Sequence, residues 1–245
     1  MKNKLLSIQN IEKRYNNIQA LKGVSLDLFA GEIISLLGIN GAGKTTLSSI
    51  IATLHPPTYG DILFEGSSIY NDLPNYRSKI GYNPQKPNLN PLLTIKDNLY
   101  FAGKYYGMSD QAVNKRLEEL NERLGINEYL SYYSTQLSGG WKQRYMIART
   151  LIHSPKLVIL DEPTVALDPD IRHQLWYYIK HIRDTGVCVL LTTHYLDEAE
   201  VLADRICLLH RGEIKLVDSP QNLIKTFEKG KLEEVFLQLT KEQKD

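Results

Sequence analysis

Cysteine is scarce in this sequence, and long apolar runs are absent from it. The two cysteines, Cys188 and Cys207, lie within apolar runs and lack metal-type spacing, which is typical of buried side chains in a reducing compartment. No stretch approaches the roughly 20 apolar residues that a membrane-spanning helix requires. The basic N-terminal residues 1–6 are not followed by an apolar core, so we expect no signal peptide. These absences predict a cytoplasmic protein.

An excess of either charge is also absent. Lysine and arginine together number 29 and aspartate and glutamate 28, for a net charge of +1. This balance disfavours a protein that binds nucleic acid over a broad surface. The 245 residues, 23% of them charged and 42% hydrophobic, suit a globular α/β domain or a core with a small inserted subdomain.

Two kinds of apolar pattern predict two kinds of β-strand. Residues 6–9 and 24–28 alternate apolar and polar side chains, as half-exposed antiparallel strands do. Residues 33–37, 157–160 and 187–191 are solidly apolar, as strands buried on both faces are. Because helical patterns follow these runs, the sequence predicts an α/β fold with a mostly parallel sheet and an N-terminal antiparallel β region.

The region from residue 88 to 154 has a helical pattern with almost no strand signal. Thr94 and Ser109 are expected to cap two of its helices, and Gly125 to end the second one. Asp168 and Pro169 predict the start of a further helix beyond this region, with a capping acid before a proline at its first position. We interpret residues 88–154 as a helical subdomain inserted into the core.

A phosphate-binding motif follows the first buried strand. Its pattern is G-x-x-x-x-G-K-[ST], and the residues that we expect to hold phosphate are Gly38, Asn40, Gly41, Ala42, Gly43, Lys44, Thr45 and Thr46. Glycines allow backbone N–H groups to turn toward phosphate oxygens, and the start of the next helix adds a partial positive charge. Lys44 is expected to reach the β- and γ-phosphates, and the hydroxyl of Thr45 to bind Mg²⁺. The sequence therefore predicts binding of a nucleoside triphosphate.

Two carboxylates end the second buried strand. Asp161 fits the acid that supports the metal, and Glu162 fits the base that orients or deprotonates the attacking water. Strand ends of this kind are where ligands bind in parallel sheets. His194 ends the next buried strand, so neighbouring strands would place it near Glu162.

The segment Leu137-Ser138-Gly139-Gly140-Trp141-Lys142-Gln143-Arg144 resembles the signature motif of ATP-binding-cassette (ABC) ATPases. It precedes the acidic strand, as in that family, and the resemblance extends over nearly the whole chain. It implies a P-loop NTPase core that hydrolyses ATP with Mg²⁺. Ser138 and the two glycines also form a second potential anion site ahead of a helix.

The resemblance implies further roles in order along the chain. Tyr15 matches the aromatic residue that stacks on adenine, and Gln85 matches the glutamine that senses Mg²⁺ and contacts the membrane-facing helical region. Residues 166–168 match the loop that follows the acidic strand, and His194 matches the switch histidine. Ser138, Gly139 and Gly140 would serve the nucleotide of a second cassette, so the family implies an ATP-induced dimer, with an identical or a paralogous partner.

Two positions depart from the family pattern. Trp141 replaces the glutamine that is commonest after the two glycines, and Val165 stands where many members have serine. The tryptophan affects only the detail of the contacts with a partner. The valine would leave out one polar contact across the dimer. The catalytic set is otherwise intact.

Several stretches resemble the branch that powers exporters with separate membrane subunits; they are residues 93–99, 104–107, 192–200 and 232–237. This resemblance implies an ATPase subunit at the cytoplasmic face of the membrane, bound to a transmembrane permease and driving export. The alternative is a soluble ABC-type ATPase that acts on ribosomes or DNA, although no second cassette or long basic insertion is present.

The expected organisation is a single ABC ATPase domain over residues 1–245. We assign residues 1–87 and 155–220 to the nucleotide-binding core, residues 88–154 to the inserted helical subdomain, and residues 221–245 to a short C-terminal tail.

Overall fold

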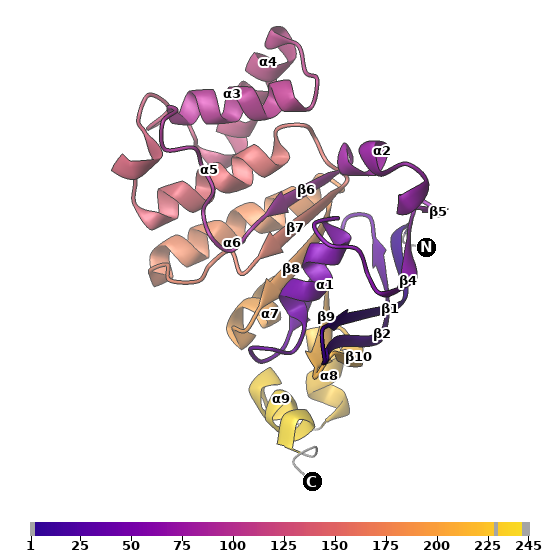
Figure 1. Ribbon diagram of the computed structural model, residues 1–245. Helices are drawn as coiled ribbons and strands as arrows, with labels where there is room; N and C mark the ends of the chain where they lie inside the picture. Colours follow the sequence, from indigo (N-terminus) through magenta and orange to yellow (C-terminus); the bar gives the residue numbers. More distant parts are fainter. Residues whose placement is uncertain (1–2, 228–229, 242–245) are drawn as a thin grey trace.

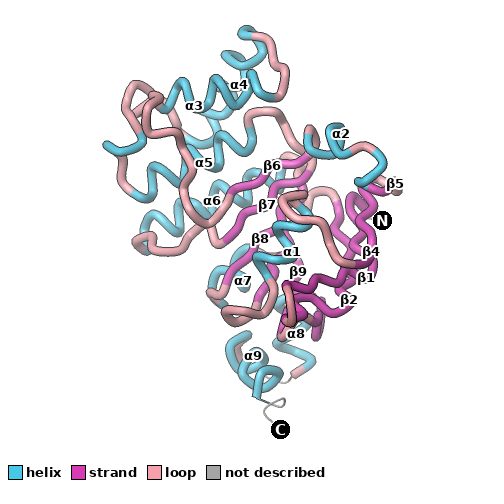
Figure 2. Tube along the Cα trace, in the orientation of Figure 1, coloured by secondary structure: helices cyan, strands magenta, loops and turns pink. Residues whose placement is uncertain are grey.

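The computed structural model describes residues 3–227 and 230–241, so the expected tail over 221–245 lies partly outside the described residues. A six-stranded sheet forms the centre (Figures 1 and 2). Its strands, in spatial order, are β10 (Glu213–Asp218), β9 (Arg205–His210), β3 (Ile33–Leu37), β8 (Cys188–Thr193), β7 (Leu157–Asp161) and β6 (Ile80–Asn83). All neighbours pair in parallel except β9 and β10, which form an antiparallel hairpin. The predicted mostly parallel core is confirmed.

A smaller antiparallel sheet packs beside it. Its order is β2 (Ile18–Phe29), β1 (Lys4–Tyr15), β4 (Tyr59–Phe64) and β5 (Ser67–Ser68). The alternating segments 6–9 and 24–28 lie in β1 and β2, where Leu6 pairs with Leu28 and Ile8 with Leu26. The predicted N-terminal antiparallel region is therefore present.

Helices connect and cover these sheets (Figure 1). Their bounds are α1 Lys44–Ile51, α2 Leu73–Arg77, α3 Ile95–Tyr105, α4 Asp110–Leu124, α5 Gly139–Leu151, α6 Pro169–Asp184, α7 Leu196–Leu202, α8 Pro220–Thr226 and α9 Leu232–Lys241. Helices α3, α4 and α5 all lie between β6 and β7 in the chain, at the end of the molecule farthest from α8 and α9. Within the described residues, no helix is both long and apolar enough to cross a membrane.

Local capping explains where the helices of this segment begin and end. Thr94 accepts a hydrogen bond from the Asp97 N–H (3.1 Å), and Ser109 accepts one from the Ala112 N–H (3.2 Å). Gly125 ends α4 in a left-handed conformation at φ 59°. Asp168 precedes α6 as expected, but its side chain makes no capping hydrogen bond, so only the proline half of that prediction is realised.

The solidly apolar strands bury both of their faces. In β7, Leu157 and Ile159 pack into a core shared with α1, whereas Val158 and Leu160 pack into a core shared with α5 and α6. Every residue of β3, β7 and β8 is buried. Both cysteines are buried free thiols within these apolar cores. The sheet is thus fixed on two sides, which holds its strand ends in place.

Candidate functional site

A cavity of about 820 Å³ lies at the carboxyl edge of the parallel sheet. Its lining includes the loop after β3, the residue after β7 and the residue after β8, in agreement with the general position of ligand sites in such sheets. The lining residues are Ile18, Gln19, Ala20, Lys22, Asn40, Gly41, Gly43, Lys44, Thr45, Thr46, Gln85, Glu162, Val165, His194 and Arg211. Most of the predicted phosphate loop is therefore present, together with the three candidate catalytic side chains, Lys44, Glu162 and His194.

Close packing requires two of the loop glycines. A Cβ atom on Gly38 would lie 2.4 Å from the carbonyl oxygen of Leu209, and Gly43 has a φ of +107°. Gly38 and Ala42 were both expected to hold phosphate, but neither lines the cavity. Ala42 is buried, and its carbonyl accepts a hydrogen bond from the Gly212 N–H at 3.0 Å. These two residues pack the loop against the β9–β10 hairpin and do not contact the cavity.

Lys44 begins α1 and is only 5% exposed. Its Nζ donates hydrogen bonds to the carbonyl oxygens of Gly38 (2.8 Å) and Ile39 (3.3 Å). Burial lowers the pKa of Lys44, while the carboxylates of Glu162 and Asp161 oppose this shift. The loop thus surrounds an ammonium group that can exchange carbonyl contacts for phosphate oxygens.

Asp161 is the last residue of β7 and is 2% exposed. It accepts a hydrogen bond from the Thr192 hydroxyl on the neighbouring strand and a longer one from the Tyr82 hydroxyl (3.5 Å). Burial raises its pKa, the Thr192 hydrogen bond lowers it, and the neighbouring Glu162 raises it further. Because the hydrogen bonds do not fully offset the burial, a cation bound at this carboxylate would stabilise its charged form.

The carboxylate of Glu162 lies close to three other side chains of the site. Its backbone is left-handed at φ 47°, and its N–H donates to the backbone oxygen (3.1 Å) and hydroxyl (3.0 Å) of Thr192. Its Oε1 lies 3.3 Å from Nδ1 of His194 and 3.8 Å from Nζ of Lys44. Its Oε2 accepts a hydrogen bond from Nε2 of Gln85 at 2.9 Å. Neighbouring strands thus bring His194 next to Glu162, as the sequence predicts.

The three expected metal ligands offer oxygen donors only. Thr45 and Gln85 line the cavity, and Asp161 directly precedes Glu162 in the chain. Hydroxyl, amide and carboxylate oxygens suit Mg²⁺, which keeps several waters and accepts few protein ligands. The donor set fits this ion, and so does the buried carboxylate of Asp161, whose charge its two hydroxyl hydrogen bonds offset only in part.

Besides Gly38, Ala42 and Asp161, four further predicted site residues lie outside the cavity lining. Tyr15 ends β1 and is 42% exposed, and its strand partner Ile18 lines the cavity in its place. Ser138 caps α5 by accepting a hydrogen bond from the Trp141 N–H at 3.4 Å. Gly139 and Gly140 follow as the first residues of α5 and face Leu167 and Ile171. Among the described residues that line the cavity of Lys44, the segment 138–140 does not occur.

The sequence interpretation missed a cationic rim. Lys22 lies on β2, and Arg211 lies in the turn between β9 and β10, and both line the cavity. Arg211 and Gly212 have φ values of 48° and 81°, as the two-residue turns of hairpins require. An Arg-Gly pair between two apolar strands could have indicated this turn, but its approach to β2 depends on tertiary packing.

Comparisons with known proteins agree with this geometry. The model of the ABC transporter family matches residues 21–165. The linearmycin resistance ATP-binding protein LnrL of Bacillus subtilis is 39% identical over 219 residues, which are 89% of this chain and 70% of that protein. Nod factor export ATP-binding protein I of Burkholderia lata is 36% identical over 90% of this chain and 73% of its own length.

Solved structures are similar over most of the chain. An ATP-binding subunit of an ABC transporter superposes with a TM-score of 0.87 at 32% identity, covering 96% of this chain and 99% of that one. A dimeric ATP-binding cassette in a post-hydrolysis state, bound to ADP and Pi, superposes with a TM-score of 0.79 at 31% identity. The superposition covers 88% of this chain and 98% of the cassette.

Proposed function

The chain belongs to the ABC transporter family of ATP-binding proteins, and on that premise we propose that it hydrolyses ATP to drive export through a separate membrane subunit. ATP binding and ATP hydrolysis are activities of this family, for which a relative has been solved with ADP and Pi. The observation that carries the proposal for this chain is the convergence of Lys44, Gln85 and His194 on the carboxylate of Glu162.

The roles of the side chains follow from their positions. Lys44 binds the β- and γ-phosphates, and the backbone of residues 38–46 surrounds them. Glu162 orients the attacking water and accepts its proton, and His194 holds the carboxylate on its other side. Thr45, Gln85 and Asp161 would hold Mg²⁺, which neutralises charge on the phosphates when it is bound. Tyr15, at the cavity margin beside Ile18, stacks on the adenine.

A second cassette completes the site. Ser138 and the first turn of α5 do not line the cavity that contains Lys44. We therefore assign their backbone N–H groups to the nucleotide of a partner cassette. A relative solved as a dimer supports this assignment. We expect Ser138→Arg to abolish hydrolysis while leaving nucleotide binding by one chain intact. Hydrolysis that survives this change would exclude the composite site.

An aromatic groove is where we place the membrane subunit. A cavity of about 410 Å³ lies among β6, the loop 88–93, α3 and α5, and Phe101 (52% exposed) and Tyr105 (86% exposed) stand at its edge. Arg149 donates a hydrogen bond to the backbone oxygen of Asn88 (2.9 Å), on the loop that follows β6 and carries Gln85. A cytoplasmic segment of the permease in this groove would press on the loop that carries Gln85. The chain would then work at the cytoplasmic face of the membrane.

The direction of transport is supported by the relatives. Two of them are named for Nod factor export and linearmycin resistance, and both are similar over about nine-tenths of this chain. We therefore place this chain in the exporter branch. The alternative, a soluble ATPase that acts on ribosomes or DNA, is not represented by these two relatives, and the net charge of +1 does not favour a nucleic-acid partner.

Co-purification tests the membrane assignment. Tagged Glu162→Gln protein is extracted in mild detergent with ATP and Mg²⁺, and bound proteins are identified by mass spectrometry. We expect one multi-helix membrane protein in stoichiometric amount, and we expect it to be lost when Tyr105→Glu is added. Tyr70→Glu, which replaces a 40% exposed tyrosine outside the groove, is the matched control. Recovery of ribosomal or DNA-bound proteins instead would overturn the transporter assignment and leave the ATPase chemistry.

A further inference from the structure

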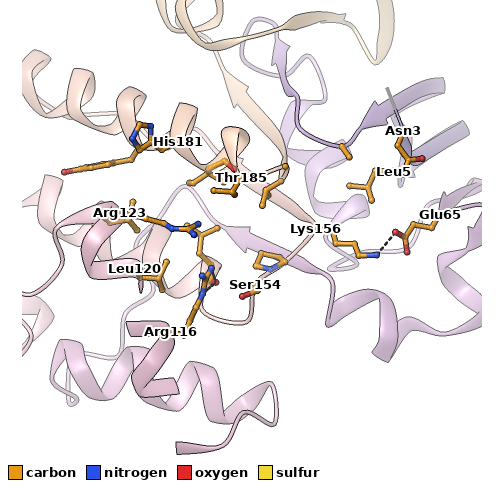
Figure 3. A pocket seen from close by; sticks show the side chains of 18 residues that line it. Asn3, Leu5, Glu65, Arg116, Leu120, Arg123, Ser154, Lys156, His181 and Thr185 are labelled. Carbon is orange, nitrogen blue, oxygen red and sulfur yellow. Dashed lines mark hydrogen bonds and ion pairs between the residues drawn. The ribbon is translucent and has the colours of Figure 1, made fainter. Parts of the chain in front are cut away.

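A second cavity, of about 500 Å³, lies at the opposite edge of the parallel sheet (Figure 3). It opens beside Lys156 and Val187, the residues directly before β7 and β8, whereas Glu162 and His194 follow those strands. The two cavities share no lining residue. Its volume lies within the range of about 300–1,000 Å³ that is common for small-molecule sites.

One wall of this cavity comes from α4. Arg116, Leu120 and Arg123 are spaced by four and three residues, so they occupy one face of that helix. In Figure 3 both guanidinium groups point toward the middle of the cavity. The same helix therefore offers two cationic groups on either side of an apolar one.

The cations of the lining differ in how they are paired. Arg116 donates to the backbone oxygen of Leu151 (3.0 Å) and to the carboxylate of Glu119 (2.8 Å), so it is a structural link. Lys156 is paired with Glu65. Arg123 is exposed, and among the residues that the structure describes its side chain makes no hydrogen bond or ion pair, although the charge of Glu119 is near it. The cavity thus holds one guanidinium whose donors are available to an incoming oxyanion.

The remaining walls combine polar side chains with an apolar patch of four residues. Leu5 comes from β1, Leu124 from α4, Leu151 from the end of α5, and Ile182 from α6. All four are buried side chains that border the cavity. A ligand that fills this space would therefore bring an apolar body as well as a charged group.

We propose that this cavity binds a small organic phosphate with an apolar or aromatic body, whose phosphate pairs with Arg123. A guanidinium presents N–H donors in a planar fork that matches phosphate oxygens, and the nearby Arg116 adds positive charge. The apolar patch of the lining receives the organic body. Such a ligand contacts α4, α6 and the start of β7 at once. It therefore links the helices between β6 and β7 to the strand that carries Asp161.

Titration calorimetry with 1-naphthyl phosphate tests this site on the full chain. We expect one molecule per chain with a Kd below about 1 mM, and an affinity at least tenfold weaker for Arg123→Gln. Lys115→Gln is the matched control, because it removes a positive charge from the same helix outside the cavity lining, and it should bind as the wild type does. Uncharged 1-naphthol should give no comparable binding.

Three results would overturn the proposal. Absence of binding to the wild-type chain would exclude this ligand class. Equal binding by Arg123→Gln would show that the guanidinium does not recognise the phosphate. If Lys44→Ala lost binding of 1-naphthyl phosphate while Arg123→Gln bound it normally, the probe would lie in the cavity lined by Lys44 instead. None of these readings depends on transport or on ATP hydrolysis.

Discussion

The amide Nε2 of Gln85 donates a hydrogen bond to Oε2 of Glu162 over 2.9 Å. Gln85 follows β6 and leads into the loop that reaches α3, whereas Glu162 follows β7. The contact therefore joins the loop that lines part of the aromatic groove to the carboxylate that we assign as the base. A shift of this loop, whether from a membrane partner or from nucleotide, changes the environment of the proton acceptor.

Replacing Lys44 should remove nucleotide affinity. Lys44→Ala deletes the buried ammonium that lies within the phosphate loop, and charge-assisted hydrogen bonds of this kind contribute about 1.5–3 kcal/mol each. We expect ATP to bind roughly 10- to 100-fold more weakly, measured by calorimetry with Mg²⁺. Lys96→Ala, an exposed lysine on α3, should bind ATP normally. Unchanged affinity in Lys44→Ala would remove the loop from the nucleotide site.

Two adjacent glycines at the start of α5 should differ in their tolerance of alanine. A Cβ atom on Gly140 would lie 2.5 Å from Cγ2 of Ile171, whereas one on Gly139 would lie 3.6 Å from Leu167, an ordinary contact. We expect Gly140→Ala to lower the free energy of unfolding by about 1–3 kcal/mol and Gly139→Ala to change it by less than about 0.5 kcal/mol. Urea denaturation of both variants measures the difference, and equal stabilities would contradict the packing.

His153 should make the protein less stable in mild acid. Burial lowers its pKa to about 4, against an ordinary value of 6.5, and the hydrogen bond to the Ile80 carbonyl (2.8 Å) only partly offsets this. Because a carbonyl accepts, Nε2 donates, and the ring also stacks on Tyr106 with centroids 3.6 Å apart. The native state therefore keeps the imidazole neutral, whereas in the unfolded chain the imidazole takes up a proton once the pH falls below 6.5.

The sign follows from this difference in proton uptake. Stability from neutral His153 is present above about pH 6.5 and declines as the pH falls toward about 4. Between pH 7.5 and 5 this residue alone should lower the free energy of unfolding by about 2 kcal/mol. We expect His153→Gln to lose that part of the pH dependence in urea denaturation, and His55→Gln, at an exposed position, to keep it. An identical pH dependence in His153→Gln would contradict the assignment.

Local signals explain why much of the fold could be predicted. The apolar runs of β3, β7 and β8 are long enough to define two-sided burial, and Thr94, Ser109 and Gly125 act through bonds to their own helices. The phosphate loop is likewise contiguous in the chain. Patterns of this kind need no knowledge of distant contacts.

Tertiary packing explains what the sequence did not reveal. Arg211 reaches the nucleotide cavity only because its hairpin turn packs on β2, where Gly212 approaches the Ala20 carbonyl so closely that a Cβ atom would lie 2.6 Å from it. Thr192 holds Asp161 through a hydrogen bond between neighbouring strands, and the two residues are 31 positions apart in the sequence. The assignment of residues 88–154 to a separate subdomain and the roles of Ser138 and Tyr15 stay predictions.

We assign Glu162 as the base of an ATPase, and its replacement by glutamine tests this assignment most directly. The measurement is phosphate release from Mg²⁺-ATP by wild-type and Glu162→Gln protein, with ATP binding followed in parallel. We expect the rate to fall by about 10²–10⁴-fold while ATP still binds, because the proton acceptor is lost and Lys44 and the loop remain. Phosphate release at the wild-type rate would contradict the assignment of Glu162 and the mechanism built on it.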